Sequence, residues 1–399
     1  MTSIENPVVA KTQVSAFIVF PPRGLDIEQD ALDQLRAVAG HGNTQAVAGF
    51  PDMHPGKCGP VGMAALCTLP VPALLGNDVG CGFSLFRLDL KARRLTDSAW
   101  IAGRLDGLDV PDFQVAGEAA SSLSMPSSHD LSLGTIGLGN HFLEVQVAHQ
   151  AQADAGVCRG DALLLVHSGS RGMGEAVYRE VVATCRDNPL AEWEGWLRKH
   201  DLCVEWARVN RICVARRVAE ALGVDHGLLL DLPHNLVERT AGGFLHRKGA
   251  SPSDRGLSIL PGSRATPSFL VSPTAADQVA AALSSLPHGA GRRLARGVAR
   301  TSTKNPQDMR TTPSMFGKPG GIVICGDDKL MLEERAEAYK DVNAVLQGVE
   351  DANLGRCVAE MHPVVTFKRS EELPVRDRTR TPEARKASMD ARTTRRKTR

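Results

Sequence analysis

The amino-acid sequence predicts one large domain of mixed α and β structure, followed by a basic tail. Segments typical of buried strands alternate with segments typical of amphipathic helices. A chain of 399 residues, of which 42% are hydrophobic, can also bury a large core. No linker-like segment interrupts residues 1–369, so we expect a single domain there and a separate tail over residues 370–399.

The predicted elements are justified here in chain order. Residues 15–20 (SAFIVF) form a short apolar run typical of a buried strand, and residues 26–40 show apolar side chains at helical spacing after an acidic first turn. Residues 162–166 predict a strand that runs into a glycine-rich loop. Residues 192–222 predict the longest helix, which Gly223 would end.

A further helix is expected between residues 272 and 287. Ser272 would be its N-cap, Pro273 would lie in its first turn and Pro287 would end it. This places His288 directly after a helix, in the glycine-rich turn HGAGR. A lone imidazole in such a turn could ligate a metal ion or attack a phosphate group, and the local pattern leaves both chemistries open.

The composition favours a cytoplasmic protein over a membrane protein. The longest uncharged run, residues 58–77, is broken by prolines and glycines, and no signal peptide opens the sequence. The chain has nine cysteines, an odd number, which favours reduced thiols over a disulfide framework. A cysteine is therefore available as a metal ligand.

The tail over residues 370–399 differs in charge from the rest of the chain. It holds ten Lys and Arg against five Asp and Glu, a net charge of +5, which leaves −3 for residues 1–369. With almost no large apolar residues, it is expected to be disordered. The alternative is an electrostatic arm that binds RNA or another polyanion.

Five short segments are rich in Gly, His, Asp, Asn and Ser, a composition that does not suit a hydrophobic core. They are PDMHPGKCG with Asp52, His54 and Lys57, GNDVGCG with Asp78 and Cys81, GTIGLGNHFLE with Asn140, His141 and Glu144, HSGSRG with His167 and Arg171, and PHN with His234 and Asn235. One thiolate, one carboxylate and three imidazoles could together hold zinc, manganese, iron or cobalt. Each histidine taken singly could equally be a hydrogen-bonded structural residue.

Two later segments combine small residues with cations. HRKGA provides Arg247 and Lys248, and the segment ILPGSRATPSFL provides Ser263 and Ser268. Backbone N–H groups and hydroxyls beside Arg or Lys are suited to binding phosphate. The sequence therefore contains candidate residues for both a metal site and a phosphate site.

Nine collinear motifs resemble the signature blocks of the RtcB family of RNA ligases. They are PDMHPG, GNDVGCG, GTIGLGNHFLE, HSGSRG, PHN, HRKGA, PGS, HGAGR and AYKDV, and with Lys368 they extend from about Asp52 to the end of the expected domain. The resemblance implies a single α+β domain in which mixed β-sheets are surrounded by helices. It also implies a GTP- and manganese-dependent ligase that joins RNA ends carrying a 2′,3′-cyclic phosphate or 3′-phosphate to 5′-hydroxyl ends.

The resemblance further implies a role for each matching residue. His288 would take GMP from GTP as a phosphoramidate. Two manganese ions would be held by Asp78, Cys81, His141, His167 and His234, with Cys81 bridging them. The guanylate pocket would be formed by Asn140, Glu144, Asn235, Pro261, Gly262, Ser263, Ser268, Gly289, Ala290, Gly291, Tyr339 and Lys368. Arg171 would bind an RNA phosphate, a role also expected for Arg247 and Lys248.

The sequence departs from the family pattern at three places. PGSRA replaces the expected PGSMG and so introduces Arg264 and Ala265, and Ala295 stands where a serine is expected. Lys368 is followed by the basic tail instead of the chain end. These differences suggest a paralogue similar to the bacterial copies associated with peptide release factor H.

Two other functions are considered beside ligation. A metal-dependent RNA cyclic phosphodiesterase or phosphatase would need the metal ligands but not His288, and an inactive RNA-binding paralogue would need only the basic residues. The presence of a thiol beside a carboxylate argues against a simple binder. The RNA ends, GTP and an archease-like activator are the expected partners of a monomer that does not contact membranes.

Overall fold

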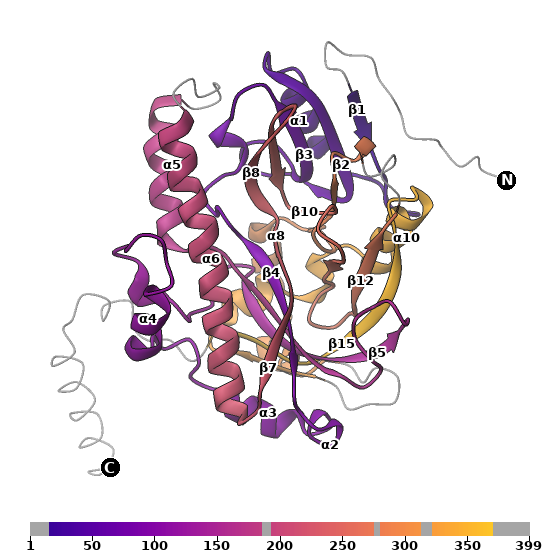
Figure 1. Ribbon diagram of the computed structural model, residues 1–399. Coiled ribbons are helices and arrows are strands. Elements are labelled where there is room, and N and C mark those ends of the chain that lie inside the picture. The colour runs from indigo at the N-terminus through magenta and orange to yellow at the C-terminus, as the bar shows by residue number, and fades with distance from the viewer. Residues whose placement is uncertain (1–15, 186–192, 275–279, 313–320, 370–399) are drawn as a thin grey trace.

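The computed structural model describes residues 16–185, 193–274, 280–312 and 321–369. Within these ranges the chain forms two large β-sheets with helices around them (Figure 1). The predicted α+β fold class is therefore confirmed. The tail over residues 370–399 lies outside the described residues, and the boundary at residue 369 stays a prediction. None of the helices in the described ranges is long and apolar enough to span a membrane.

The first sheet has the strand order β1-β2-β3-β9-β8. β1 and β2 are parallel, and the other neighbouring strands are antiparallel. The bounds are β1 (Ala16–Val19), β2 (Thr44–His54), β3 (Val61–Cys67), β8 (Asn235–Thr240) and β9 (Gly243–Lys248). β1 and helix α1 (Gln29–Ala39) confirm the strand and the helix expected in the first 40 residues.

The second sheet has the order β11-β12-β15-β5-β6-β4-β7, and β14 pairs with β15 in parallel. Its strands are β4 (Gly82–Leu88), β5 (Phe142–Ala151), β6 (Ala162–Ser168), β7 (His226–Pro233), β11 (Ser258–Leu260), β12 (Ser268–Pro273), β14 (Ile322–Cys325) and β15 (Gly355–Arg369). Every residue of β6 is buried, as its continuous apolar run predicts for a central strand.

Helix α6 (Trp193–Leu222) packs against β4, β6 and β7 of the second sheet (Figure 1). Trp206, Val209 and Cys213 lie on its buried face, and Gly223 follows its end with a φ of 68°. The long helix predicted from the sequence is thus confirmed. The other described helices are α2 (Ala92–Leu95), α3 (Ser98–Leu105), α4 (Phe113–Ala120), α5 (Gly172–Cys185), α8 (Arg296–Arg300), α9 (Asp328–Glu333) and α10 (Val342–Asp351).

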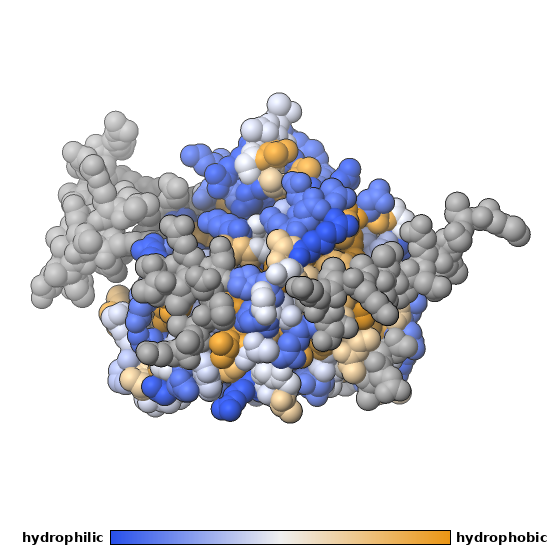
Figure 2. Space-filling view, turned by 90° about the horizontal axis from the view of Figure 1, so that it is seen from above, coloured by the Kyte–Doolittle hydropathy of each residue, from blue (hydrophilic) through white to orange (hydrophobic). Residues whose placement is uncertain are grey.

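The hydrophobic core has two principal parts. One lies between the second sheet and helices α3 and α6, where Phe86 and Leu164 meet Val218. The other joins the first sheet to β12 and α10, where Phe50 and Phe269 pack with other apolar side chains. Figure 2 shows one face of the molecule, on which hydrophilic residues dominate and hydrophobic ones form small scattered groups.

The helix expected from Ser272 to Pro287 is wrong at both ends. Ser272 and Pro273 belong to β12, and Ser285–Pro287 forms β13, which pairs with β10 (Ala250–Pro252). Pairing of Ser272 with Arg356 of β15 overrides the local capping pattern. His288 therefore follows a strand instead of a helix, while residues 275–279 lie outside the described ranges.

Candidate functional site

The ends of three neighbouring strands bring the predicted metal ligands together. Cys81 immediately precedes β4, His141 immediately precedes β5, and His167 is the penultimate residue of β6. The register pairs His167 with both Phe83 and Phe142. Because adjacent strands lie about 4.8 Å apart, this register places the three side chains at one edge of the sheet.

We call Asp78, Cys81, His141, His167 and His234 the donor cluster. Cys81 Sγ lies 3.1 Å from His167 Nε2 and 3.4 Å from His141 Nε2, which in turn lies 3.0 Å from Asp78 Oδ2. One ligand atom each of Cys81, His141 and His167 falls within 4.8 Å of the others. The His234 ring centroid lies 5.2 Å from that of His167.

The protonation states of the donor cluster suit a divalent cation. Burial lowers the pKa of His167 and that of His234 well below the usual value, which keeps both imidazoles neutral and able to donate a lone pair. Burial, with the nearby Asp78 carboxylate, raises the pKa of the Cys81 thiol. A bound cation would offset this by stabilising the thiolate.

Two buried ring nitrogens of the donor cluster also lack a partner. His141 Nδ1 and His234 Nδ1 make no hydrogen bond to any of the described residues. Buried polar atoms without a partner are rare in native proteins and are compatible with an unmodelled ion or water. Together with the mixed N, O and S donor set, they show that these residues fit a metal ion.

His288 contacts the donor cluster and is oriented by a carboxylate distant in sequence. Its ring centroid lies 4.8 Å from that of His234. Its Nδ1 lies 2.6 Å from Oδ2 of Asp52, and its backbone N–H donates to the same oxygen at 3.1 Å. Asp52 is fully buried at the end region of β2. If Nδ1 carries the proton, Nε2 is left with the lone pair needed for nucleophilic attack.

The turn after His288 fits closely against Asp52. Gly291 has a φ of 71°, and a Cβ there would lie 2.1 Å from the Asp52 carbonyl oxygen. Only glycine is therefore compatible with this approach. Asp52 was noticed in a polar motif but received no role from the sequence, and the signal that could have found it was the fully polar character of PDMHPG in an otherwise buried strand.

Several residues predicted for the guanylate pocket lie in one hydrogen-bonded network. Gln146 donates to Glu144 Oε1 at 2.7 Å and to Ser268 Oγ at 3.0 Å, and Thr366 donates to the other oxygen of Glu144. Burial raises the pKa of Glu144 to about 7. Ala290 N–H donates to the Pro261 carbonyl at 3.0 Å, which brings the HGAGR and PGS motifs together.

A second group, which we call the cationic pocket, consists of Arg264, Arg292, Glu334, Tyr339 and Lys368. Arg292 lies 3.0 Å and Lys368 3.4 Å from the buried Glu334 carboxylate, to which Tyr339 also donates. Although burial opposes ionisation, the charges of Lys368 and Arg292 hold the pKa of Glu334 below its usual value. Arg264 is 8% exposed and donates to the Met331 carbonyl at 3.2 Å.

The other predicted guanylate residues are connected less directly. Asn140 contributes its carbonyl to His167 Nδ1 at 3.2 Å, and Asn235 donates to the Asp78 carbonyl at 2.6 Å, so both support the donor cluster. Ser263 N–H donates to Thr266 Oγ1 at 2.6 Å. The guanylate role of these residues, and of Gly262 and Gly289, stays a prediction.

The three residues expected to contact RNA phosphates occupy different environments. Arg171 has a φ of 60° and donates to the Ile136 carbonyl at 3.1 Å, beside His141 and the donor cluster. Arg247 is 1% exposed and donates to Ser285 Oγ at 2.9 Å, and Lys248 is 8% exposed and donates to two loop carbonyls. An RNA role for the last two stays a prediction, and their described contacts are with the protein itself.

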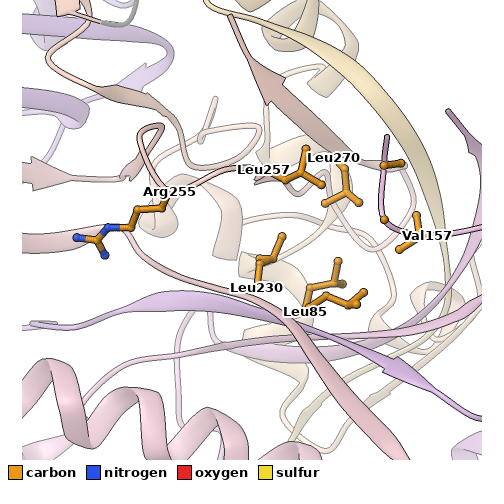
Figure 3. A pocket seen from close by; sticks show the side chains of 9 residues that line it. Leu85, Val157, Leu230, Arg255, Leu257 and Leu270 are labelled. Carbon is orange, nitrogen blue, oxygen red and sulfur yellow. The ribbon is translucent and has the colours of Figure 1, made fainter. Parts of the chain in front are cut away.

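An apolar cavity lies apart from these groups. It has a volume of about 160 Å³ and is lined by leucines including Leu85, Leu230, Leu257 and Leu270. In Figure 3 these leucines converge, while the guanidinium of Arg255 points away from them. None of the predicted site residues lines this cavity.

The fold and the donor cluster define a mixed α+β protein with a metal-binding site beside an oriented histidine. A family model described as tRNA-splicing ligase RtcB matches residues 112–369. The chain is 37% identical to RNA-splicing ligase RtcB2 of Escherichia coli, over 86% of this chain and 93% of that protein. It is 26% identical to tRNA-splicing ligase RtcB of Nanoarchaeum equitans, over 80% of this chain and 87% of that one. The chain belongs to the RtcB family, as its motifs predicted.

Proposed function

We propose that this protein is a GTP- and manganese-dependent RNA ligase that works through a guanylylated His288. It would join RNA ends carrying a 2′,3′-cyclic phosphate or 3′-phosphate to 5′-hydroxyl ends, in RNA repair or tRNA splicing. The relatives named above are called RNA-splicing and tRNA-splicing ligases, which supports the reaction class. The observation that carries the proposal is the contact of His288 Nδ1 with buried Asp52 beside the donor cluster.

In the first step, His288 Nε2 attacks the α-phosphorus of GTP. A P–N bond forms, the P–O bond to pyrophosphate breaks, and Asp52 holds the proton that remains on Nδ1 and stabilises the positive charge that develops on the ring. Asp78, Cys81, His141, His167 and His234 would hold manganese. When bound, manganese would supply positive charge that neutralises the phosphoryl oxygens.

The next steps pass the guanylate on. An oxygen of the RNA 3′-phosphate attacks the same phosphorus, the P–N bond breaks, and His288 regains its lone pair. The 5′-hydroxyl then attacks the RNA phosphorus, its proton is lost and GMP leaves. Arg171, beside the donor cluster, would orient the RNA phosphate by its charge. A cyclic phosphate end would first be opened by water.

The cationic pocket supports guanylate binding. Arg264, Arg292 and Lys368 surround a single buried carboxylate, Glu334, so positive charge is in excess among these described residues. An anionic nucleotide would offset that excess. Cytoplasmic location, a monomeric state and activation by an archease-like protein remain predictions.

The test is covalent guanylylation measured by intact mass. Full-length protein incubated with GTP and manganese should gain one GMP that is lost in acid. The variant His288→Ala should show no gain, and His226→Ala, which changes an exposed histidine on β7, should behave as wild type. If wild type remained unmodified with manganese, cobalt and zinc alike, ligation would be excluded. Cyclic-phosphate hydrolysis that Cys81→Ala abolishes would then identify a phosphodiesterase.

A further inference from the structure

Arg211, in the middle of α6, is a fully buried cation that the proposed reaction does not use. Its guanidinium pairs with Asp231 of β7 at 2.8 Å and donates to Ser84 Oγ at 2.9 Å. Its NH1 atom donates to two backbone carbonyls, Gly80 O at 3.0 Å and Ser168 O at 2.9 Å. One side chain on the helix thus connects two strands and two loops of the second sheet.

The two carbonyls that Arg211 binds are adjacent to metal ligands. Gly80 precedes Cys81, and Ser168 follows His167. The ligand atoms of these two residues lie 3.1 Å apart. A guanidinium that holds both neighbouring carbonyls therefore fixes the relative position of the two loops at the point where their ligand atoms must converge.

The loop of Cys81 is also pressed against α6 itself. Gly80 has a φ of 75°, and a Cβ at this position would lie 2.9 Å from the Cα of Val204. The loop therefore has no room for a side chain between it and the helix. This close contact is what brings the Gly80 carbonyl within reach of Arg211.

The neighbouring residue Asn210 ties in the loop that leads to His141. It is fully buried, and its Oδ1 accepts from Gly134 N–H at 2.8 Å. Its Nδ2 donates to Thr135 O and to Ser168 Oγ, both at 3.0 Å. Consecutive residues of one helix thereby hold the segments that carry three of the five members of the donor cluster.

We propose that Arg211, assisted by Asn210, is a positioning residue that preassembles the donor cluster for a divalent cation. A role in stability alone would explain the pairing with Asp231, but a buried ion pair is often no more stabilising than an apolar pair. It would not explain why the remaining donors reach the residues next to Cys81 and His167. The inference rests on the proposed function, because it takes the donor cluster to be a metal centre.

The test measures cobalt binding by the metal-free full-length protein. Co²⁺ bound by Cys81 should give a thiolate-to-cobalt charge-transfer absorption that Cys81→Ala removes. Arg211→Lys retains the positive charge but cannot reach Asp231 and both carbonyls at once. We expect its cobalt affinity to fall by about 10- to 100-fold, with a changed absorption spectrum. Asn210→Ala should lower the affinity by about tenfold.

Two controls separate positioning from loss of the fold. Arg216→Lys makes the same substitution on the same helix, at a half-exposed residue that pairs with Glu118 and Glu220, and should bind cobalt as wild type does. The double variant Arg211→Met with Asp231→Asn removes the buried charge pair together, so no unpaired ion remains. A cooperative thermal transition of the metal-free double variant shows that it folds, and its cobalt affinity should still be reduced.

The outcomes distinguish this inference from the proposed function. If wild type binds cobalt through Cys81 and the folded Arg211 variants bind it with equal affinity and spectrum, the positioning role is overturned and the proposed function stands. If wild type shows no cobalt-thiolate absorption, the metal centre fails, and the inference fails with it. Weaker, spectrally altered binding in Arg211→Lys but not Arg216→Lys supports the inference.

Discussion

The donor cluster and the cationic pocket have opposite charge requirements. In the donor cluster, burial keeps His167 and His234 neutral and disfavours the Cys81 thiolate, so a cation would complete it. In the cationic pocket, three cations surround the Glu334 carboxylate, so an anion would complete it. His288 contacts the first through His234 and precedes Arg292 of the second by four residues. A nucleotide with its divalent cation matches this division of charge.

The two regions also differ in how they are assembled. Most of the donor cluster lies at the ends of paired strands, where the register fixes the side chains. The cationic pocket combines residues of separate loops with Lys368 near the end of β15. Each of the following experiments changes one region and asks whether the other keeps its property.

The largest effect is expected from Cys81→Ala. Because Cys81 contacts both His141 and His167, its loss should abolish manganese binding in isothermal titration calorimetry and prevent the GMP adduct. Cys158→Ala, at an exposed cysteine, is the control. Full manganese affinity in Cys81→Ala would show that the donor cluster is not the metal centre.

The next effect is expected from Asp52→Asn. Loss of the carboxylate beside Nδ1 should slow formation of the GMP adduct by about 10²- to 10⁴-fold, as at other histidines oriented by a carboxylate. Single-turnover mass measurements give the rate, and manganese affinity should stay unchanged because Asp52 is not a ligand. An unchanged rate would contradict the orienting role of Asp52.

Glu144→Gln tests the pH dependence of the buried network. The pKa of Glu144 is raised to about 7, so the folded state holds this proton more tightly than the unfolded state does. Stability should therefore fall as pH rises from about 4.5 to about 7, by on the order of 3 kcal/mol. In Glu144→Gln, urea unfolding should lose that part of the pH dependence, while the surface variant Glu180→Gln retains it. Identical profiles for wild type and Glu144→Gln would refute this.

The smallest effect is expected from Arg264→Met, which restores the residue expected in the family pattern. Removal of one buried cation near Glu334 should weaken GTP binding by about tenfold, measured by calorimetry in the presence of manganese. Arg300→Met, whose half-exposed side chain pairs with Glu333, is the control. Equal or tighter GTP binding in Arg264→Met would show that Arg264 does not contribute to the anion site.

The sequence alone determined the chemistry of the site and the strongly periodic elements. Cys81, His141 and His167 were expected as ligands from their residue types and motifs, and they converge in the structure. The long helix over residues 192–222 was predicted because its 3.6-residue periodicity is local information. Motif order likewise predicted the family before the geometry was known.

Only the tertiary structure decided the contacts between residues far apart in the chain. The pairing of Asp52 with His288 spans 236 positions, and the clamp from Arg211 to the Gly80 and Ser168 carbonyls depends on how α6 packs on the sheet. The helix expected at Ser272 became a strand for the same reason, because β15 supplied hydrogen-bond partners there. Local patterns record periodicity and capping, whereas hydrogen-bond partners across a sheet are fixed by register and packing.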